Sequence, residues 1–398
     1  MPGNGRRPAL IAGGGIAGAA AAIALQQVGV EPVIYEARAE GPDQVGTFLT
    51  VATNGIDALR GLGADRPVLE RGFATPAIVL RSATGKLLGS VITGVALADG
   101  TLSHTLKRAD LYAALTGEAL ARGVRIEYGK KLIDARAEGD GVRAVFADGS
   151  QTVGAMLIGA DGVHSAVRRL VDPAAPGPRY EGLLSTGGYA RGIEVAASVG
   201  SYEMIFGRRA FFGYVPAPSG EVWWFANLPR RDEPSADQPQ DPQTPDLRAQ
   251  LLEVFADDAG PARDLVQATP EVAAVTPLHT VSRLACWHRG PIVLIGDAAH
   301  APSPTSGQGA SLSIEDAAEL AWAIRRNDTT TAAFIAFEAS RRQRVERIVK
   351  WASRMNNSKA PGPVGCAIRD ATMPTAMRLM ASSKTMRLPY QHHVEPLR

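Results

Sequence analysis

Short apolar runs alternate with a longer helical pattern at the start of the chain. A continuous apolar run over residues 8–12 predicts a buried strand, and residues 16–28 have the composition of an alanine-rich helix that Gly29 would end. The apolar residues at 33–35 predict a second strand. This order of strand, helix and strand is typical of a parallel α/β unit, so we expect the chain to begin with one.

Alternating apolar and polar residues predict several further strands before residue 160. In chain order the expected elements are a loop over 39–54, a helix over 55–62, a hairpin over 73–91, a strand over 103–107, a helix over 108–122 and strands over 124–128, 131–137, 142–147 and 152–158. In the helix over 108–122, Leu111, Leu115 and Leu120 are expected on the buried side.

Aromatic residues become frequent between 183 and 228, where strand patterns dominate. This shift in composition predicts a second domain built on a β-sheet. The remaining chain is expected to hold a proline-rich exposed loop over 229–246, a helix over 247–265, a buried strand over 292–295, a helix over 309–326 and mostly helix over 331–386.

Composition narrows the class of protein. A formal net charge of +2 over 398 residues is too close to neutral to favour nucleic acid or an anionic membrane as a partner. The two cysteines, Cys286 and Cys366, form no CxxC motif, which argues against a disulfide-reductase centre or a zinc site. Few cysteines also fit a cytoplasmic protein.

The N-terminus resembles an export signal, because Arg6-Arg7 precede a charge-free run over 9–25. The glycine spacing inside that run gives a different interpretation. Gly13, Gly15 and Gly18 form a GxGxxG motif between the predicted strand and helix. We therefore expect this segment to be retained.

Each glycine of the motif has a predicted role in binding a dinucleotide. Gly13 permits a tight turn, Gly15 lets a pyrophosphate approach the backbone, and Gly18 lets the helix pack closely on the strand. The helix N-terminus, at Ile16 and Ala17, presents free N–H groups to the phosphates. Glu36 ends the second strand and can accept hydrogen bonds from a ribose. This motif fits either NAD or the ADP half of FAD.

A second motif, GDAAH followed by PTSGQGA, favours FAD. Asp297 follows a predicted strand, where its carboxylate can bind a polyol hydroxyl. The glycines after Pro304, at 307 and 309, allow backbone contact with a flat ring. The helix that begins near Gly309 and Ala310 directs its positive end at that ring and would stabilise negative charge on a reduced flavin.

With the sequence ADGVHSAVR at 160–168, these motifs resemble the para-hydroxybenzoate hydroxylase-like, class A flavoprotein monooxygenases. The resemblance covers nearly the whole chain. It implies an α/β fold with a Rossmann-like FAD-binding domain, an inserted β-sheet substrate domain and C-terminal helices. We expect FAD-binding segments at 1–180 and 276–355, the substrate domain at 181–275 and a helical segment at 356–398.

The resemblance also implies roles for individual residues. Glu36 and Arg38 would hold the adenosine ribose region, Arg108 would contact FAD, and Asp297 would hold the ribityl chain. Asp161 is implicated in handling both FAD and NAD(P)H. The full expected cofactor-binding set is Gly13, Gly15, Ile16, Ala17, Gly18, Glu36, Arg38, Arg108, Asp161, Asp297, Pro304, Gly307, Gly309 and Ala310. One departure is Ser311, where many relatives have Asn.

The implied reaction is the hydroxylation of an aromatic or conjugated small molecule. NAD(P)H would reduce FAD, and O₂ would form a flavin C4a-hydroperoxide that transfers oxygen. No metal site and no catalytic side chain is indicated. Two alternatives stay open: an NAD(P)H oxidase or reductase without oxygen transfer, and a flavin-carrying ligand-binding protein. The substrate, the choice between NADH and NADPH, and the oligomeric state are not indicated.

Candidate substrate contacts come from the aromatic strands and two loops. They are Phe48, Tyr214, Trp224 and Thr305, although aromatic residues on strands are also common in cores. His300 is interpreted as a structural residue. Four arginines at 341, 342, 344 and 347 are interpreted as a solvated helix face.

Overall fold

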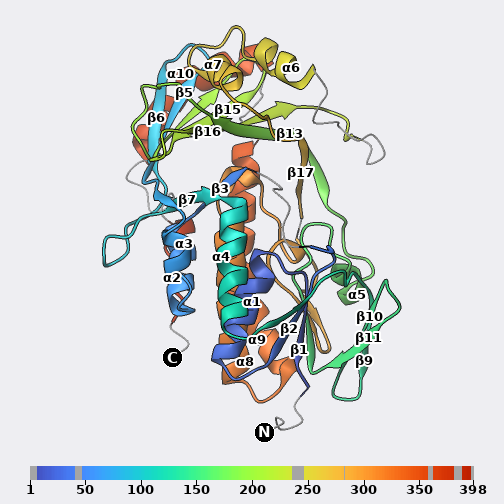
Figure 1. The fold of residues 1–398 in the computed structure, drawn as a ribbon. Coiled ribbons are helices and arrows are strands. Elements are labelled where there is room, and N and C mark those ends of the chain that lie inside the picture. The colour runs from blue at the N-terminus through green and yellow to red at the C-terminus, as the bar shows by residue number, and fades with distance from the viewer. Residues whose placement is uncertain are drawn as a thin grey trace.

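A six-stranded sheet forms the centre of the lower half of the molecule in Figure 1. This computed structural model describes residues 7–40, 47–234, 246–281, 283–356, 362–380 and 388–395. Four consecutive pairs in the sheet are parallel, and all residues of the strand that starts the chain are buried. In spatial order the strands are β18 (His288–Arg289), β19 (Ile292–Leu294), β12 (Met156–Gly159), β1 (Ala9–Ala12), β2 (Pro32–Tyr35) and β8 (Arg125–Glu127).

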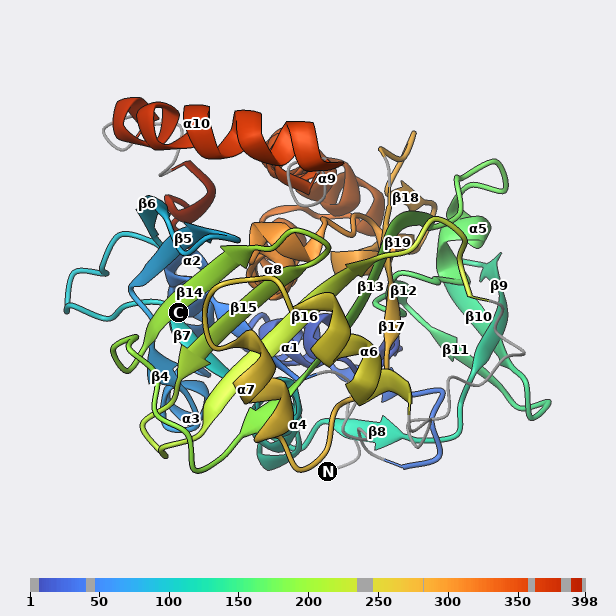
Figure 2. The same ribbon diagram turned by 90° about the horizontal axis from the view of Figure 1, so that it is seen from above.

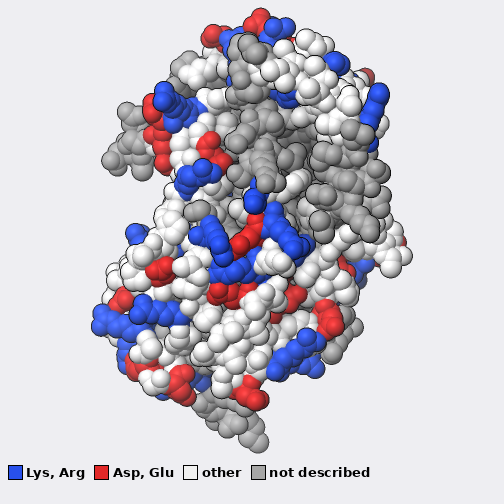
Figure 3. Space-filling view, turned by 180° about the vertical axis from the view of Figure 1, so that it is seen from behind, with Lys and Arg blue, Asp and Glu red and all other residues white. Residues whose placement is uncertain are grey.

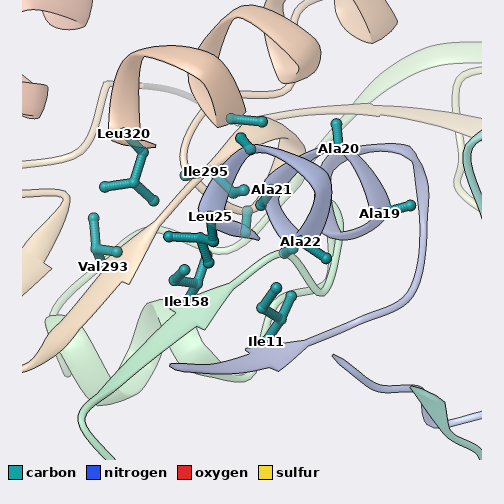
Figure 4. Packing of buried hydrophobic residues seen from close by; sticks show 14 of the residues in the cluster. Ile11, Ala19, Ala20, Ala21, Ala22, Leu25, Ile158, Val293, Ile295 and Leu320 are labelled. Atoms are coloured by element: carbon teal, nitrogen blue, oxygen red, sulfur yellow. The ribbon is translucent and has the colours of Figure 1, made fainter. Parts of the chain in front are cut away.

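Helices pack against this sheet and against one another. The alanine-rich helix α1 (Ile16–Gln27) contacts α8 (Gly309–Arg326) and α4 (Arg108–Ala121). Small side chains let α1 be buried on nearly all sides, and Figure 4 shows its Leu25 among Ile158, Val293 and Leu320. The other helices of this half are α2 (Thr53–Gly61), α3 (Arg66–Leu69), α5 (Val167–Val171) and α9 (Thr330–Asn356).

The buried side of α4 differs from its prediction at one position. Leu111 and Leu115 are fully buried, but Leu120 is 52% exposed. At 3.6 residues per turn, a residue five positions after Leu115 lies about 140° around the helix. Ala119 takes the buried position instead.

A seven-stranded sheet forms the upper half, and it draws on three separate parts of the chain. Its spatial order is β17 (Thr276–Thr280), β13 (Arg179–Ala190), β16 (Val222–Pro229), β15 (Phe211–Pro216), β14 (Ser201–Phe206), β5 (Ala77–Ser82) and β6 (Leu87–Ile92). The hairpin expected over 73–91 is confirmed as β5 and β6. It lies outside the range 181–275 that was expected to form this domain, as does β17. Strand periodicity cannot reveal which sheet a strand joins.

Helices cover one face and one end of this upper sheet. Figure 2 shows α6 (Asp246–Val254) and α7 (Ala262–Gln267) over its outer face and α10 (Gly362–Met380) beside β6. The single helix expected over 247–265 is thus two helices, separated around Gly260 and Pro261. Residues 235–245 of the expected proline-rich loop lie outside the described residues.

Two small sheets complete the fold. One contains β3 (Phe48–Val51), β7 (His104–Lys107) and β4 (Phe73–Ala74), and the other contains β11 (Gln151–Gly154), β10 (Gly141–Phe146) and β9 (Leu132–Glu138). The loop expected over 39–54 therefore contains a strand, whereas its residues 41–46 lie outside the described part. No helix among the described residues is long and apolar enough to cross a membrane. The face in Figure 3 carries acidic and basic side chains intermixed, which agrees with the near-neutral net charge.

Candidate active site

A cavity of about 1320 Å³ lies between the two halves of the molecule. Sites for a drug-sized ligand occupy about 300–1,000 Å³, so this volume suits a dinucleotide together with a second small molecule. One end is lined by the glycine loop after β1 and the chain around Glu36. The other is lined by strands of the upper sheet and by α10.

The three glycines have the surroundings that their predicted roles require. Gly13 has φ of 101°, and a Cβ there would lie 2.5 Å from the Ala160 carbonyl oxygen. A Cβ on Gly18 would lie 2.0 Å from the Gly13 carbonyl oxygen, so only glycine permits this packing. A Cβ on Gly15 would meet no atom within 4 Å. Gly15 therefore borders open space in the cavity, as a pyrophosphate site requires.

Glu36 is held in place by backbone groups at the end of β2. Its Oε2 accepts a hydrogen bond of 2.7 Å from the Gly14 N–H, and its Oε1 accepts one of 3.0 Å from the Arg38 N–H. Each carboxylate oxygen keeps a further acceptor site for a ribose hydroxyl. Glu36 and Arg38 both line the cavity, where the predicted adenosine site would be.

Asp297 lies in the short helix η1 (Gly296–Ala298) directly after β19 and lines the same cavity. Burial raises the pKa of Asp297, and the nearby His300, Arg108 and Arg168 partly oppose this rise. The Asp297 side chain is half-buried at the cavity wall, where, among the described residues, its ionised carboxylate lacks a hydrogen-bonding partner of opposite charge close enough to cancel this rise. A polyol that donates hydrogen bonds would therefore stabilise it. Arg108 begins α4 and also lines the cavity, so these two predicted cofactor residues lie in one site.

Asp161, unlike Glu36 and Asp297, forms its hydrogen bonds with the start of a helix. Its carboxylate accepts hydrogen bonds from the backbone N–H groups of Ala166 (2.7 Å) and Val167 (3.1 Å) and from the Ser165 hydroxyl. It therefore caps α5. Burial also raises the pKa of Asp161. Its loop borders the cavity, and a direct role in nucleotide binding stays a prediction.

Arg168 joins that loop to the one around Asp297. Its buried guanidinium donates to the carbonyl oxygens of Ala298 (2.8 Å), Val163 (2.9 Å) and Asp297 (3.0 Å). The motif at 160–168 thus builds the wall of the site from backbone, and its charged side chains hold that backbone in place.

The N-terminus of α8 borders the cavity beside η2 (Pro304–Ser306). Pro304, Gly307, Gly309 and Ala310 line it, as predicted for the flavin end. The side chain of Thr305 lies outside the described part of the structure. Ser311 is fully buried, and its Oγ accepts a 3.0 Å hydrogen bond from the Ala52 N–H. The serine at 311, where many relatives have Asn, therefore affects the contact between α8 and the start of α2.

A network of buried charged residues lies behind α8, and the sequence patterns did not predict it. Arg341 is fully buried and forms ion pairs of 2.7 Å with both Glu315 and Asp316. The Asp316 carboxylate also pairs with His300 Nε2 at 2.6 Å and accepts a bond from the Gly296 N–H at 2.9 Å. The solvated-face interpretation is thus wrong for Arg341 and also for Arg344, which is largely buried and pairs with Glu315 at 2.7 Å. The available signal was the pair of adjacent acids, Glu315 and Asp316, in the first half of α8 among mostly small and apolar residues.

Nearby basic side chains keep both acids of this network ionised. Arg341 lowers the pKa of Glu315 to about 2, with help from Arg344. His300 and Arg341 lower the pKa of Asp316 to about 2. The network fixes the backbone next to Asp297, since Gly296 is bound to Asp316.

The aromatic wall of the cavity is formed by other residues of the upper sheet than the two that were predicted. Phe206, Phe211 and Phe225 line the cavity, together with Tyr202, Met204 and Asn227. Tyr214 and Trp224 instead belong to the hydrophobic cluster under α6 and α7. Trp224 Nε1 donates to Thr269 at 2.7 Å on that side. The prediction that these two residues form the wall is corrected, because alternation along a strand fixes which residues share a face but not which face is which.

Phe48 lies where it was expected, on the cavity wall. Its ring packs near those of Tyr202, Trp223 and Phe225, with centroids 5.6–6.4 Å away. It comes from β3 of the small sheet between the two halves, so it joins the flavin end to the upper sheet.

The chain is similar to known FAD-dependent proteins over most of its length. A family model described as "FAD binding domain" matches residues 6–352. The chain is 31% identical to the Aurachin C monooxygenase/isomerase of Stigmatella aurantiaca over 94% of each protein. It is 30% identical to the FAD-dependent urate hydroxylase of Klebsiella pneumoniae over 86% of this chain and 87% of that one. The structure of Klebsiella pneumoniae HpxO with FAD and uric acid superposes with a TM-score of 0.83 at 26% identity, covering 97% of this chain and 98% of that one. The chain therefore belongs to the FAD-binding domain family and is an FAD-dependent monooxygenase of the para-hydroxybenzoate hydroxylase-like class.

Proposed function

We propose that this enzyme hydroxylates a planar aromatic or conjugated small molecule, with NAD(P)H as reductant and O₂ as oxygen source. The observation that carries the proposal is the continuous cavity, which has dinucleotide-binding features at one end and an aromatic wall at the other. Names of relatives support a heteroaromatic substrate. They include FAD-dependent urate hydroxylase, 2-heptyl-3-hydroxy-4(1H)-quinolone synthase and 6-hydroxynicotinate 3-monooxygenase.

The residues at the first end fit FAD. The open space at Gly15 would receive the pyrophosphate, Glu36 the ribose, and Asp297 the ribityl chain. When bound, FAD would take electrons from NAD(P)H and activate O₂ for insertion of one oxygen atom. The N-terminus of α8 would place its positive dipole end beside the flavin ring.

The second end would exclude water and orient the substrate. Phe206, Phe211 and Phe225 supply flat apolar surfaces on which an aromatic ring can stack. Water exclusion matters because oxygen transfer competes with release of hydrogen peroxide. We propose that this wall, with Phe48 at its edge, limits that loss.

A group of hydroxyls supplies polarity within the wall. Thr50 Oγ1 lies 3.1 Å from the Tyr202 hydroxyl, and Thr105 Oγ1 lies within 3.0 Å of both. Burial raises the pKa of Tyr202 to about 12, so its hydroxyl keeps its proton near neutral pH. Thr50 and Tyr202 line the cavity and can orient a polar atom of the substrate.

Product yield per NAD(P)H tests this function against its alternatives. The purified protein would be screened with aromatic and heteroaromatic compounds, and hydroxylated product and peroxide would be counted separately. A hydroxylase gives product with a substrate-stimulated rate of NAD(P)H consumption. Peroxide alone with every compound would favour an oxidase, and no NAD(P)H consumption would favour a binding protein.

The two free cysteines and the use of NAD(P)H support a cytoplasmic location as part of the proposal.

A further inference from the structure

Arg369 occupies an unusual position on α10, where the helix faces the cavity. Arg369, Met373 and Met377 follow one another at four-residue spacing, so they lie on one face of the helix. All three line the cavity. The two methionines pack against an apolar cluster that contains Leu80 and Phe206. The arginine therefore extends an otherwise apolar stripe, although it is only 7% exposed.

Not every N–H donor of the Arg369 guanidinium has a hydrogen-bond partner. Its Nε and Nη2 bind Asp370 Oδ1 at 2.9 and 2.8 Å, and Nη2 also donates to the Phe206 carbonyl oxygen at 3.3 Å. The charge centre lies 4.8 Å from the centroid of the Phe206 ring. Nη1 is buried and has no hydrogen-bond partner. A buried donor without a partner costs free energy, so this arrangement suits a ligand that brings an acceptor.

The distribution of charge along the cavity points to the nature of that ligand. Among the described lining residues, the carboxylates are Glu36, Glu40, Asp161 and Asp297, all from the segments that form the dinucleotide end. The other lining cations, Arg38, Arg108, Lys130 and Lys131, come from those segments too. At the upper-sheet end the described lining residues thus provide one cation, Arg369, and no carboxylate.

We infer that Arg369 binds the carboxylate of an aromatic acid, and that this pair sets which part of the substrate lies deepest in the cavity. The inference rests on the proposed function, because it concerns the substrate of the same site. A planar guanidinium matches a carboxylate in geometry, and the ring of Phe206 beside it offers a surface for stacking. The substrate ring would then lie between this anchor and the flavin end.

Binding to the oxidised holoenzyme tests this directly. The probes are benzoate, 1-naphthoate and quinoline-4-carboxylate, each compared with its primary amide by calorimetric titration. At least one acid should bind about tenfold or more tightly than its amide, as charge-assisted hydrogen bonds predict. In Arg369→Gln the acid should lose about 10- to 100-fold in affinity, whereas the amide should change by no more than about threefold. Arg369→Lys should recover part of the preference.

A control variant separates a local anchor from a general effect of charge. Arg209 is on the outer side of the same half, where it pairs with Asp257 at 3.0 Å. Arg209→Gln should leave the acid-to-amide ratio unchanged. FAD occupancy and thermal unfolding of Arg369→Gln should match wild type, which would show that the variant folds. Equal affinity for every acid and its amide in the wild type, or an unchanged ratio in a folded Arg369→Gln, would overturn the inference.

The same samples distinguish this inference from the proposed function. Acids that bind through Arg369 but never yield an oxygenated product would leave the anchor standing and refute hydroxylation of these compounds. Conversely, efficient hydroxylation of neutral compounds, with no effect of Arg369→Gln on KM, would support the function and refute the anchor.

Discussion

Gly15 and Gly18 lie three residues apart and have opposite surroundings. A side chain at Gly15 would enter open cavity, whereas one at Gly18 would collide with the Gly13 carbonyl oxygen. We predict that Gly15→Val folds with the thermal stability of the wild-type apoprotein but retains less than about a tenth of the FAD. Gly18→Val should destabilise the apoprotein itself, by about 3 kcal/mol or more. Thermal unfolding and FAD absorbance per chain measure the two effects. Full FAD occupancy in Gly15→Val would contradict the proposed docking.

Replacing Asp297 with Asn should have opposite effects on the stability of the apoprotein and on the retention of FAD. The folded-state pKa of Asp297 is raised by burial, so folding disfavours the ionised form. That penalty is absent well below the ordinary pKa of 3.8, grows as pH rises to the folded value and is constant above it. At neutral pH, Asp297→Asn should therefore raise the free energy of unfolding of the apoprotein.

The same substitution should weaken FAD binding about tenfold or more, because it removes a charged acceptor. Urea unfolding of the apoprotein between pH 4 and 8 and FAD titration at pH 7 would measure the two effects. A variant that is less stable and binds FAD normally would show that Asp297 is structural.

At the scale of elements, the helices and strands with long apolar patterns could be predicted from the sequence. The pairing of strands within the sheets could not. The alanine-rich helix and its flanking strands are confirmed, because buried elements carry continuous apolar runs. The strand β3 was missed, since it is short and only partly buried along most of its length. The glycine and Asp297 motifs lead directly to the cavity because they are local in sequence. Which face of β15 and β16 points to the cavity depends on where α6 and α7 pack. The pattern of residues along a strand cannot indicate that packing.

The buried network between α8 and α9 makes a prediction about helix packing. Arg341→Met leaves Glu315 and Asp316 without their shared cation and should cost about 3–5 kcal/mol in unfolding free energy. Arg347 is exposed on the same helix, so Arg347→Met should change stability by less than about 0.5 kcal/mol. Urea unfolding at pH 7 compares the two. Equal stability of both variants would mean that the network contributes nothing.

The pH dependence of that network has a definite sign. Both acids have folded pKa values of about 2, below their ordinary values of 4.5 and 3.8. Their contribution to stability is present above about pH 4.5 and is lost as pH falls towards 2. The difference between wild type and Arg341→Met should therefore shrink over that range. A difference that grows on acidification would contradict the assigned ion pairs.

At the scale of the whole molecule, the cavity is closed by parts of the chain that are distant in sequence. The described C-terminal residues 388–395 return to the lower half, where Arg344 donates to the Pro389 carbonyl oxygen at 2.8 Å and His393 pairs with Asp57 at 2.8 Å. Tyr390 lies between these contacts and lines the cavity. The chain end and α10 thus build the site together with β5, β14 and β16.

From this closure we predict that the coupling of NAD(P)H use to product depends on one face of the upper sheet. Phe225 faces the cavity from β16, whereas Tyr214, on the neighbouring strand β15, faces α6 and α7. Phe225→Ala should open space beside the reacting region and admit water, which raises the share of NAD(P)H that ends as hydrogen peroxide about twofold or more. Tyr214→Ala removes a ring of similar size from the far face. It should lower the unfolding temperature but leave the product yield per NAD(P)H within error of wild type, with FAD bound in both variants. Product and peroxide would be quantified below the unfolding temperature of the weaker variant. Equal uncoupling by both substitutions would show that loss of stability, rather than loss of the wall, controls peroxide release.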